Sequence, residues 1–207
     1  MSEAAALQHD DAPPLVLAST SISRRALLRG AGLRFDCVAP EVDEDALKRA
    51  QPTADGAALA GLLADRKALA ISERRPGAIV VGGDQTLACD GRLFDKPGDL
   101  EAARAQLRAL RGRVHELQSA VSVARGGVVA WRHLASARLT MRAFSDRFID
   151  SYIAAAGLTL TTSVGAYRLE GPGAQLFERI DGDYFTILGL PLLPLLAWLR
   201  TAGVLPT

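Results

Sequence analysis

Residues 80–97, VVGGDQTLACDGRLFDKP, decide how the rest of the chain is interpreted. The apolar run over residues 78–81 has the length and the β-branched content of a buried strand. Gly82 and Gly83 follow it, and two successive glycines predict a tight turn that brings the backbone close to a ligand. We therefore expect Asp84 at the carboxyl end of the strand, where open α/β sheets bind their ligands.

The second half of this stretch contains a turn, Asp90-Gly91, and ends with Lys96 before Pro97. A carboxylate and an ammonium at the two ends of one loop suit a substrate that carries phosphate and a metal ion. The simpler interpretation is an acidic turn with a surface lysine. Both interpretations stay open on this stretch alone.

The composition limits the classes of protein that the chain can belong to. It has 207 residues, of which 49% are hydrophobic, and a formal net charge of +1. We expect a disordered leader at residues 1–13 and a single domain at residues 14–207, built as one body or two joined lobes. The chain has no basic block, so we do not expect it to bind a nucleic-acid polymer, although binding a single nucleotide needs only a few local charges. Without a secretory signal or an unbroken apolar span, we expect a cytoplasmic protein that does not bind a membrane.

Lysine usage is more informative than net charge. The 24 basic residues include only three lysines, which are Lys48, Lys67 and Lys96. In a chain that otherwise uses arginine, a lysine indicates a place that needs a compact, rotatable ammonium. Cys37 and Cys89 lack the spacing of a zinc site, so the sequence predicts no structural zinc.

Two segments upstream of residues 80–97 carry candidate binding groups. A strand at residues 15–18 leads through three hydroxyl side chains into a helix at residues 24–29, and such a turn binds phosphate through free backbone N–H groups. Arg24 and Arg25 oppose the helix dipole there and favour an anion. The alternative is an ordinary capped helix with solvated arginines. Likewise, the acidic residues 41–45 are either metal ligands or a solvated loop.

The remaining segments predict an α/β fold. We expect a short strand at residues 35–39 and helices at residues 53–75, 99–110, 145–156 and 192–200. Two long strands, at residues 114–124 and 128–142, are joined by Gly126-Gly127 and predict a hairpin.

Taken together, these segments resemble the Maf family of nucleoside triphosphate pyrophosphatases. The resemblance runs from Leu15 to about Arg200. Its parts, in the family's order, are LASTSISRRALL, APEVDE, LADRKA, GGDQTL, FDKP, YRLEGPGAQLFERIDGDY and GLPL. It implies a mixed, bent sheet with flanking helices and two lobes around an elongated cleft, as in inosine triphosphate pyrophosphatases.

The resemblance also implies which residues bind the substrate. Ser19 and Arg24 fall at the hydroxyl and the arginine of the family's phosphate-binding turn, with Arg25 beside them. Lys67 matches the family's helix lysine, and Lys96 matches the lysine of its KP motif. Two of the three lysines therefore stand at motif positions.

Two carboxylates match the family's catalytic and metal-binding positions. Asp84 falls at the aspartate assigned as the catalytic proton acceptor, and Glu44 falls at the acidic position after the second strand. The resemblance implies that both hold a divalent cation, Mg²⁺ or Mn²⁺. The implied reaction splits a nucleoside triphosphate between its α and β phosphates into a monophosphate and pyrophosphate.

Three positions bear on the choice of base. Gln85 and Glu170 match the branch that acts on 7-methyl-GTP, a non-standard nucleotide removed by house-cleaning enzymes. A carboxylate accepts hydrogen bonds from the N1–H and the amine of 7-methylguanine and attracts its cationic ring. Ser23 departs from both branches, since the 7-methyl-GTP branch has Trp there and the dTTP/UTP branch has Arg.

Several alternatives stay open at this stage. The chain is either selective for 7-methyl-GTP or prefers dTTP and UTP. A second class is a non-catalytic nucleotide-binding regulator, since the family is associated with arrest of septum formation. A house-cleaning enzyme for deaminated purines such as inosine triphosphate ranks last because its motifs differ. The resemblance also implies a homodimer.

Overall fold

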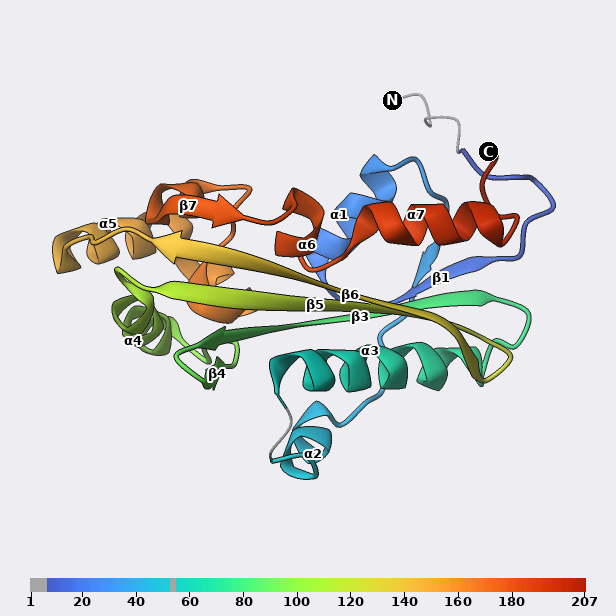
Figure 1. Cartoon of the computed structure of the whole chain (residues 1–207), viewed down its shortest axis with the longest axis horizontal. Coiled ribbons are helices and arrows are strands. Elements are labelled where there is room, and N and C mark those ends of the chain that lie inside the picture. The colour runs from blue at the N-terminus through green and yellow to red at the C-terminus, as the bar shows by residue number, and fades with distance from the viewer. Residues whose placement is uncertain (1–6, 53–54) are drawn as a thin grey trace. The chain divides into compact units, whose positions relative to one another are not determined.

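The computed structural model describes residues 7–52 and 55–207. Its strands are β1 (Leu15–Ala18), β2 (Asp36–Cys37), β3 (Ile79–Cys89), β4 (Arg92–Phe94), β5 (Val114–Arg125), β6 (Val128–Met141) and β7 (Phe177–Asp181). Its α-helices are α1 (Ile22–Gly30), α2 (Glu44–Arg49), α3 (Gly56–Ser72), α4 (Leu100–Leu110), α5 (Asp146–Ala156), α6 (Tyr184–Ile187) and α7 (Leu192–Thr201) (Figure 1). Short 3₁₀ helices occupy Gly157–Thr162, Val164–Ala166 and Pro172–Leu176.

In the described residues the strands form one mixed sheet in the order β2-β1-β3-β5-β6-β7, with β4 paired to β3. Strand β1 is parallel to both β2 and β3, whereas β3–β4 and β6–β7 are antiparallel. The predicted α/β fold with a mixed sheet and flanking helices is therefore confirmed.

The chain divides into two compact units, each with its own buried core. Unit 1 comprises Met1–Gln85, Ser119–Ala135 and Gly189–Thr207, and unit 2 comprises Thr86–Gln118 and Ser136–Leu188. Strands β3, β5 and β6 contribute residues to both units. The single domain expected over residues 14–207 stays a prediction.

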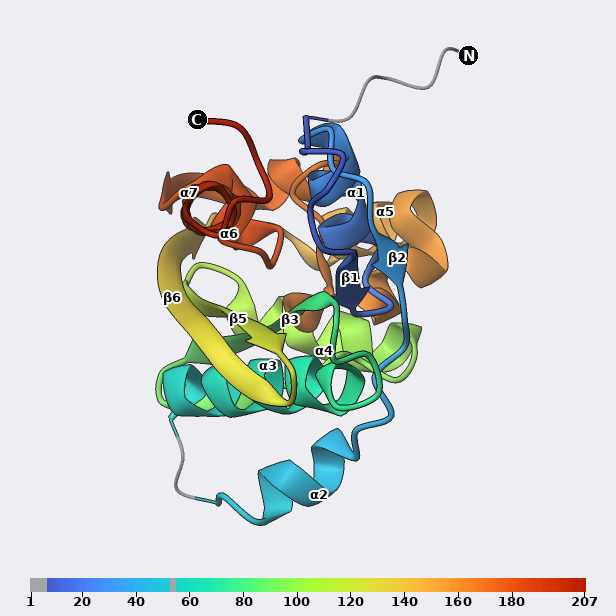
Figure 2. The ribbon, with the colours of Figure 1, turned by 90° about the vertical axis from the view of Figure 1, so that its right-hand side faces the viewer.

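Unit 1 is layered. Helix α3 covers one face of its strands, and helices α1 and α7 lie on the other face, as two views at right angles agree (Figures 1 and 2). Val16 and Val80, on the paired strands β1 and β3, pack with Ile71 of α3 in a fully apolar cluster. This packing fixes α3 against β3, so side chains on the facing sides of the two elements meet.

Local sequence signals predicted most helices and strands correctly. The predicted N-caps Asp99 and Ser145 each accept a hydrogen bond from the first turn of their helix. The helix predicted over residues 53–75 is shorter, at Gly56–Ser72 with Asp55 as its N-cap, and residues 53–54 lie outside the described residues. The short strand predicted over residues 35–39 contains only Asp36 and Cys37.

The turn predicted at Gly82-Gly83 is wrong. Strand β3 continues through both glycines to Cys89, and Ala18 of β1 pairs with Gly82. A Cβ built on Gly82 would lie 2.3 Å from the carbonyl oxygen of Ala64 and 2.7 Å from the amide nitrogen of Ala68. The glycine therefore lets helix α3 approach the strand, and Asp84 lies in the middle of a strand instead of at its end.

The expected leader falls partly outside the described residues, since its first six residues are not among them. From residue 7 onward, Leu7 N donates to Gly32 O at 3.2 Å and His9 N donates to Val204 O at 3.1 Å. Within the ranges that the structure describes, no helix combines the length and apolarity that crossing a bilayer requires.

Candidate functional site

Lys67 bridges two carboxylates that come from separate elements. It lies on the buried face of α3, between Leu63 and Ile71, and is only 6% exposed. Its Nζ donates to Asp84 Oδ1 at 2.6 Å and lies 2.8 Å from Glu44 Oε1. One ammonium therefore joins strand β3 to the start of helix α2.

The two carboxylates differ in exposure. The Asp84 side chain is 10% exposed, whereas that of Glu44 is 43% exposed. Burying a charge is costly unless it is paired, so the short contact with Lys67 is what stabilises an ionised Asp84 inside the sheet. Glu44 presents the same ion pair to solvent.

Arg24 lies on the buried face of helix α1 and hydrogen-bonds to the connections before α1 and before α7. Ser21 caps this helix by accepting from Arg24 N, and Ser19 Oγ accepts from Ser21 N at 3.1 Å and from Arg24 Nη1 at 3.4 Å. Arg24 Nε donates to Gly189 O at 2.7 Å. Burial lowers the pKa of the Arg24 guanidinium, while the charges of Asp84 and Glu44 act in the opposite direction.

Arg24, Glu44, Lys67 and Asp84 thus form one group of opposite charges, which we call the ion-pair cluster. All four belong to unit 1, and the structure brings them together from α1, α2, α3 and β3. Two cations face two carboxylates. Such a group can bind phosphate oxygens through the cations and a metal ion through the carboxylates.

Gln85 follows Asp84 on β3 and is held by a neighbouring strand. Its Nε2 donates to the hydroxyl of Ser119, a fully buried residue of β5, at 2.7 Å. This bond fixes the orientation of the amide. Its Oε1 lies on the side of Gly189, where a built Cβ would be 3.6 Å away.

Four other predicted site residues divide between the two units. Ser23 and Arg25 lie half-buried in the first turn of α1. Lys96 and Glu170 belong to unit 2, where Lys96 is exposed. Arg168 donates to Glu170 Oε1 from both Nε, at 3.0 Å, and Nη2, at 2.8 Å, so the Glu170 carboxylate forms an ion pair with Arg168.

The donor set of the ion-pair cluster fits a metal ion that arrives with its ligand. Among the residues that the structure describes, no three or more His, Cys, Asp or Glu side chains are grouped to hold a metal. Asp84 and Glu44 supply two carboxylates around one ammonium. Mg²⁺ typically takes one or two carboxylates and completes its shell with water and substrate phosphates, so two suffice.

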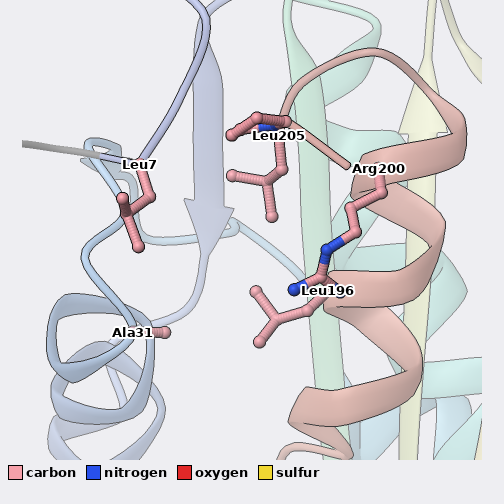
Figure 3. A pocket seen from close by; sticks show the side chains of 6 residues that line it. Leu7, Ala31, Leu196, Arg200 and Leu205 are labelled. Carbon is pink, nitrogen blue, oxygen red and sulfur yellow. The ribbon is translucent and has the colours of Figure 1, made fainter.

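Three contact residues were missed from the sequence, namely Ser119, Arg168 and Gly189. Arg168 and Gly189 stand inside quoted motifs, but spacing gives no sign that they touch site residues. A separate open pocket of about 110 Å³ is lined by Leu7, Ala31, Leu196, Arg200, Leu205 and Pro206 (Figure 3). It shares no residue with the ion-pair cluster.

The chain is similar to proteins of known families. The family model described as Maf-like protein matches residues 14–202. A nucleoside triphosphate pyrophosphatase from Hyphomonas neptunium is 52% identical over 198 residues, covering 93% of this chain and 98% of its own. A 7-methyl-GTP pyrophosphatase from Brucella abortus is 51% identical over 190 residues, covering 90% of this chain and 94% of its own.

Among solved structures, a HAM1 protein from Coxiella burnetii matches with a TM-score of 0.36 and 14% identity. The match covers 63% of this chain and 73% of the HAM1 chain. That likeness is too distant to inform the site.

Proposed function

This chain belongs to the Maf family and is a nucleoside triphosphate pyrophosphatase, and we propose that the ion-pair cluster is its catalytic centre. The observation that carries the proposal is the position of Lys67, whose ammonium lies within 2.8 Å of both carboxylates. The Lys67 ammonium would keep the Asp84 carboxylate ionised and in position, and it would bind phosphate oxygens when the substrate enters.

In the proposed reaction, Asp84 is the proton acceptor. A water molecule adds to the α-phosphorus, the bond from that phosphorus to the bridging oxygen breaks, and pyrophosphate leaves. The proton of the water passes to the Asp84 carboxylate, which must lie within hydrogen-bond reach of that water. Asp84 and Glu44 would hold a divalent cation, Mg²⁺ or Mn²⁺, which when bound polarises the phosphate.

The cations of the cluster would bind the triphosphate. Arg24 and the hydroxyl of Ser19 lie at the N-terminal end of α1, where the helix dipole favours an anion. Lys67 would turn from Asp84 to the phosphate oxygens, which frees the carboxylate to accept a proton. Arg25 and Lys96 are proposed as further phosphate ligands on the resemblance of their motifs.

For the base we propose a preference for 7-methyl-GTP. Relatives of about 50% identity include proteins named 7-methyl-GTP pyrophosphatase as well as proteins named nucleoside triphosphate pyrophosphatase. Glu170, which accepts from Arg168, would accept from the guanine edge, and Gln85, held by Ser119, would hydrogen-bond to the base through its amide. Ser23 would leave space where the 7-methyl-GTP branch has Trp.

The test is pyrophosphate release from 7-methyl-GTP, UTP, dTTP, CTP and ITP with Mg²⁺ or Mn²⁺, for the wild type and Asp84→Asn. We expect 7-methyl-GTP to give the highest kcat/KM and Asp84→Asn to lose about 10²–10⁴-fold in kcat. Turnover led by UTP and dTTP would refute the preference and leave the mechanism. Full turnover by a folded Asp84→Asn would remove Asp84 from its role, and nucleotide binding without any turnover would favour a regulator.

Two broader expectations belong to the same proposal. The enzyme would work in the cytoplasm, where nucleoside triphosphates are made. It would act as a homodimer, which sedimentation of the full chain tests directly.

A further inference from the structure

Gly189 contacts the ion-pair cluster from far along the sequence. It is the first residue of GLPL, in the connection between helices α6 and α7. Its carbonyl oxygen accepts from Arg24 Nε at 2.7 Å across 165 residues of chain. Gly189 therefore supplies a backbone carbonyl to this buried guanidinium.

The backbone conformation at Gly189 suits only glycine. Its φ is +91°, which places it in the region that residues with a side chain rarely adopt. A Cβ at this position would lie 3.4 Å from Arg24 Nη2 and 3.6 Å from Gln85 Oε1. A side chain here would strain the backbone that carries the carbonyl, and its Cβ would come into contact with both the arginine and the amide.

A second glycine lies against the same arginine. A Cβ built on Gly83 would be 3.2 Å from Arg24 Nε and 3.4 Å from its Cδ. The Arg24 side chain therefore runs between two glycine backbones, one from β3 and one from the α6–α7 connection. The hydrogen bond at Nε and the close approach of Gly83 together restrict the movement of the guanidinium.

We propose that Gly189 is a positioning residue for catalysis, acting through Arg24. Its carbonyl sets the guanidinium for the phosphate, and its missing side chain keeps the space between Arg24 and Gln85 open. This inference rests on the proposed function. It gives GLPL a role at the triphosphate and at the base, although the motif carries no reactive side chain.

The first experiment compares Gly189→Ala with Gly203→Ala. Gly203 lies in the same unit, also has positive φ, at +70°, and has open space where a Cβ would be. Both variants should melt a few degrees below the wild type because of backbone strain. Only Gly189→Ala should lose kcat/KM, by about 10- to 100-fold, because a misplacement of about 1 Å costs this much. Gly189→Asn, whose residue type tolerates positive φ better, replaces it if Gly189→Ala does not fold.

The second experiment is a double-mutant cycle with Arg24→Ala. If Gly189 acts through Arg24, Gly189→Ala should change kcat/KM by less than about twofold once Arg24 is absent. The same fold-loss in both backgrounds would show a merely structural role and overturn the inference. The cycle is repeated on the dissociation constant of a non-hydrolysable triphosphate analogue. A wild type that binds the analogue but shows no turnover would refute the proposed function, and the affinity cycle would still test the role of Gly189. A wild type that shows neither binding nor turnover would overturn both the proposed function and the inference about Gly189.

Discussion

Replacing Lys67 by methionine tests the structural role and the proposed catalytic role of the ion-pair cluster together. Methionine keeps the length of the lysine stem and removes the charge, so the apolar packing of the stem on α3 is retained. The change leaves Asp84 with one cation fewer, in a place where its side chain is only 10% exposed. We expect Lys67→Met to lose both stability and activity.

The expected size of the stability loss follows from the two contacts. Removing one partner of a buried ion pair costs about 3–5 kcal/mol. Arg24, whose charge interacts with Asp84, offsets part of this, and the pair with the 43% exposed Glu44 adds about 0–1 kcal/mol. The free energy of unfolding should therefore fall by about 3 kcal/mol. Losing a charged hydrogen bond to phosphate, worth about 1.5–3 kcal/mol, should lower kcat/KM by about 10- to 150-fold.

The assay is urea unfolding together with pyrophosphate release. Lys48→Met, the same change at a half-buried lysine of α2 outside the cluster, is the matched control and should retain activity. The double variant Lys67→Met/Asp84→Asn has no unpaired carboxylate at position 84, so it should regain most of the lost stability while remaining inactive. A double variant no more stable than Lys67→Met would refute the argument that Lys67 stabilises a charged Asp84.

Two other predictions concern pH and metal. Burial lowers the pKa of His115 to about 4, against an ordinary value of 6.5. In the unfolded chain His115 therefore binds a proton below about pH 6.5, whereas in the folded chain it binds one only below about pH 4. The free energy of unfolding should fall by about 3 kcal/mol as pH falls from 6.5 to 4. His115→Phe should show a correspondingly smaller fall between urea melts at pH 7.5 and 4.5, and an equal fall would contradict the assignment. Without nucleotide, the dissociation constant of Mn²⁺ should be no lower than about 10⁻⁴ M, because the two carboxylates share Lys67. A non-hydrolysable triphosphate analogue should lower this dissociation constant at least about tenfold. Calorimetry that finds tight Mn²⁺ binding without nucleotide would contradict this.

The elements that the sequence predicted well are those set by neighbouring residues. The Asp90-Gly91 turn has positive φ at both residues, and so does Gly126-Gly127 between the two long strands. Each requires only a local backbone preference, which the residue types reveal. The caps Asp99 and Ser145 are equally local, because the cap and the amide it satisfies are three residues apart.

The turn predicted at Gly82-Gly83 was wrong because this part of the chain is determined by distant residues. Two glycines favour a turn when only their own conformational freedom is considered. Here Gly82 serves the close approach of α3, and the atoms that need the space belong to Ala64 and Ala68, more than a dozen residues earlier. A local preference was overridden by packing that no neighbouring residue indicates.

The site shows the same division between local and distant information. Lys67, Asp84 and Glu44 were placed through the resemblance of motifs, since residues 80–97 alone also fitted an acidic turn and residues 41–45 alone also fitted a solvated loop. The contact of Gly189 with Arg24 joins residues 165 apart and involves a backbone carbonyl, which every residue has. No side-chain chemistry in the sequence marks such a contact, so only the structure reveals it.

The charge balance of the ion-pair cluster explains how it can form before a substrate arrives. Lys67 pairs with both Glu44 and Asp84, and the charges of these two carboxylates also act on the buried Arg24. A nucleotide that enters with a divalent cation brings negative oxygens for the cations and a positive ion for the carboxylates, and so one set of ion pairs replaces another. Arg24 is held on Gly189 and flanked by glycine backbones, which leaves it little freedom to move. We therefore expect Lys67, with a compact ammonium on a flexible stem, to be the group that changes partner when a triphosphate binds, a role that suits lysine better than arginine.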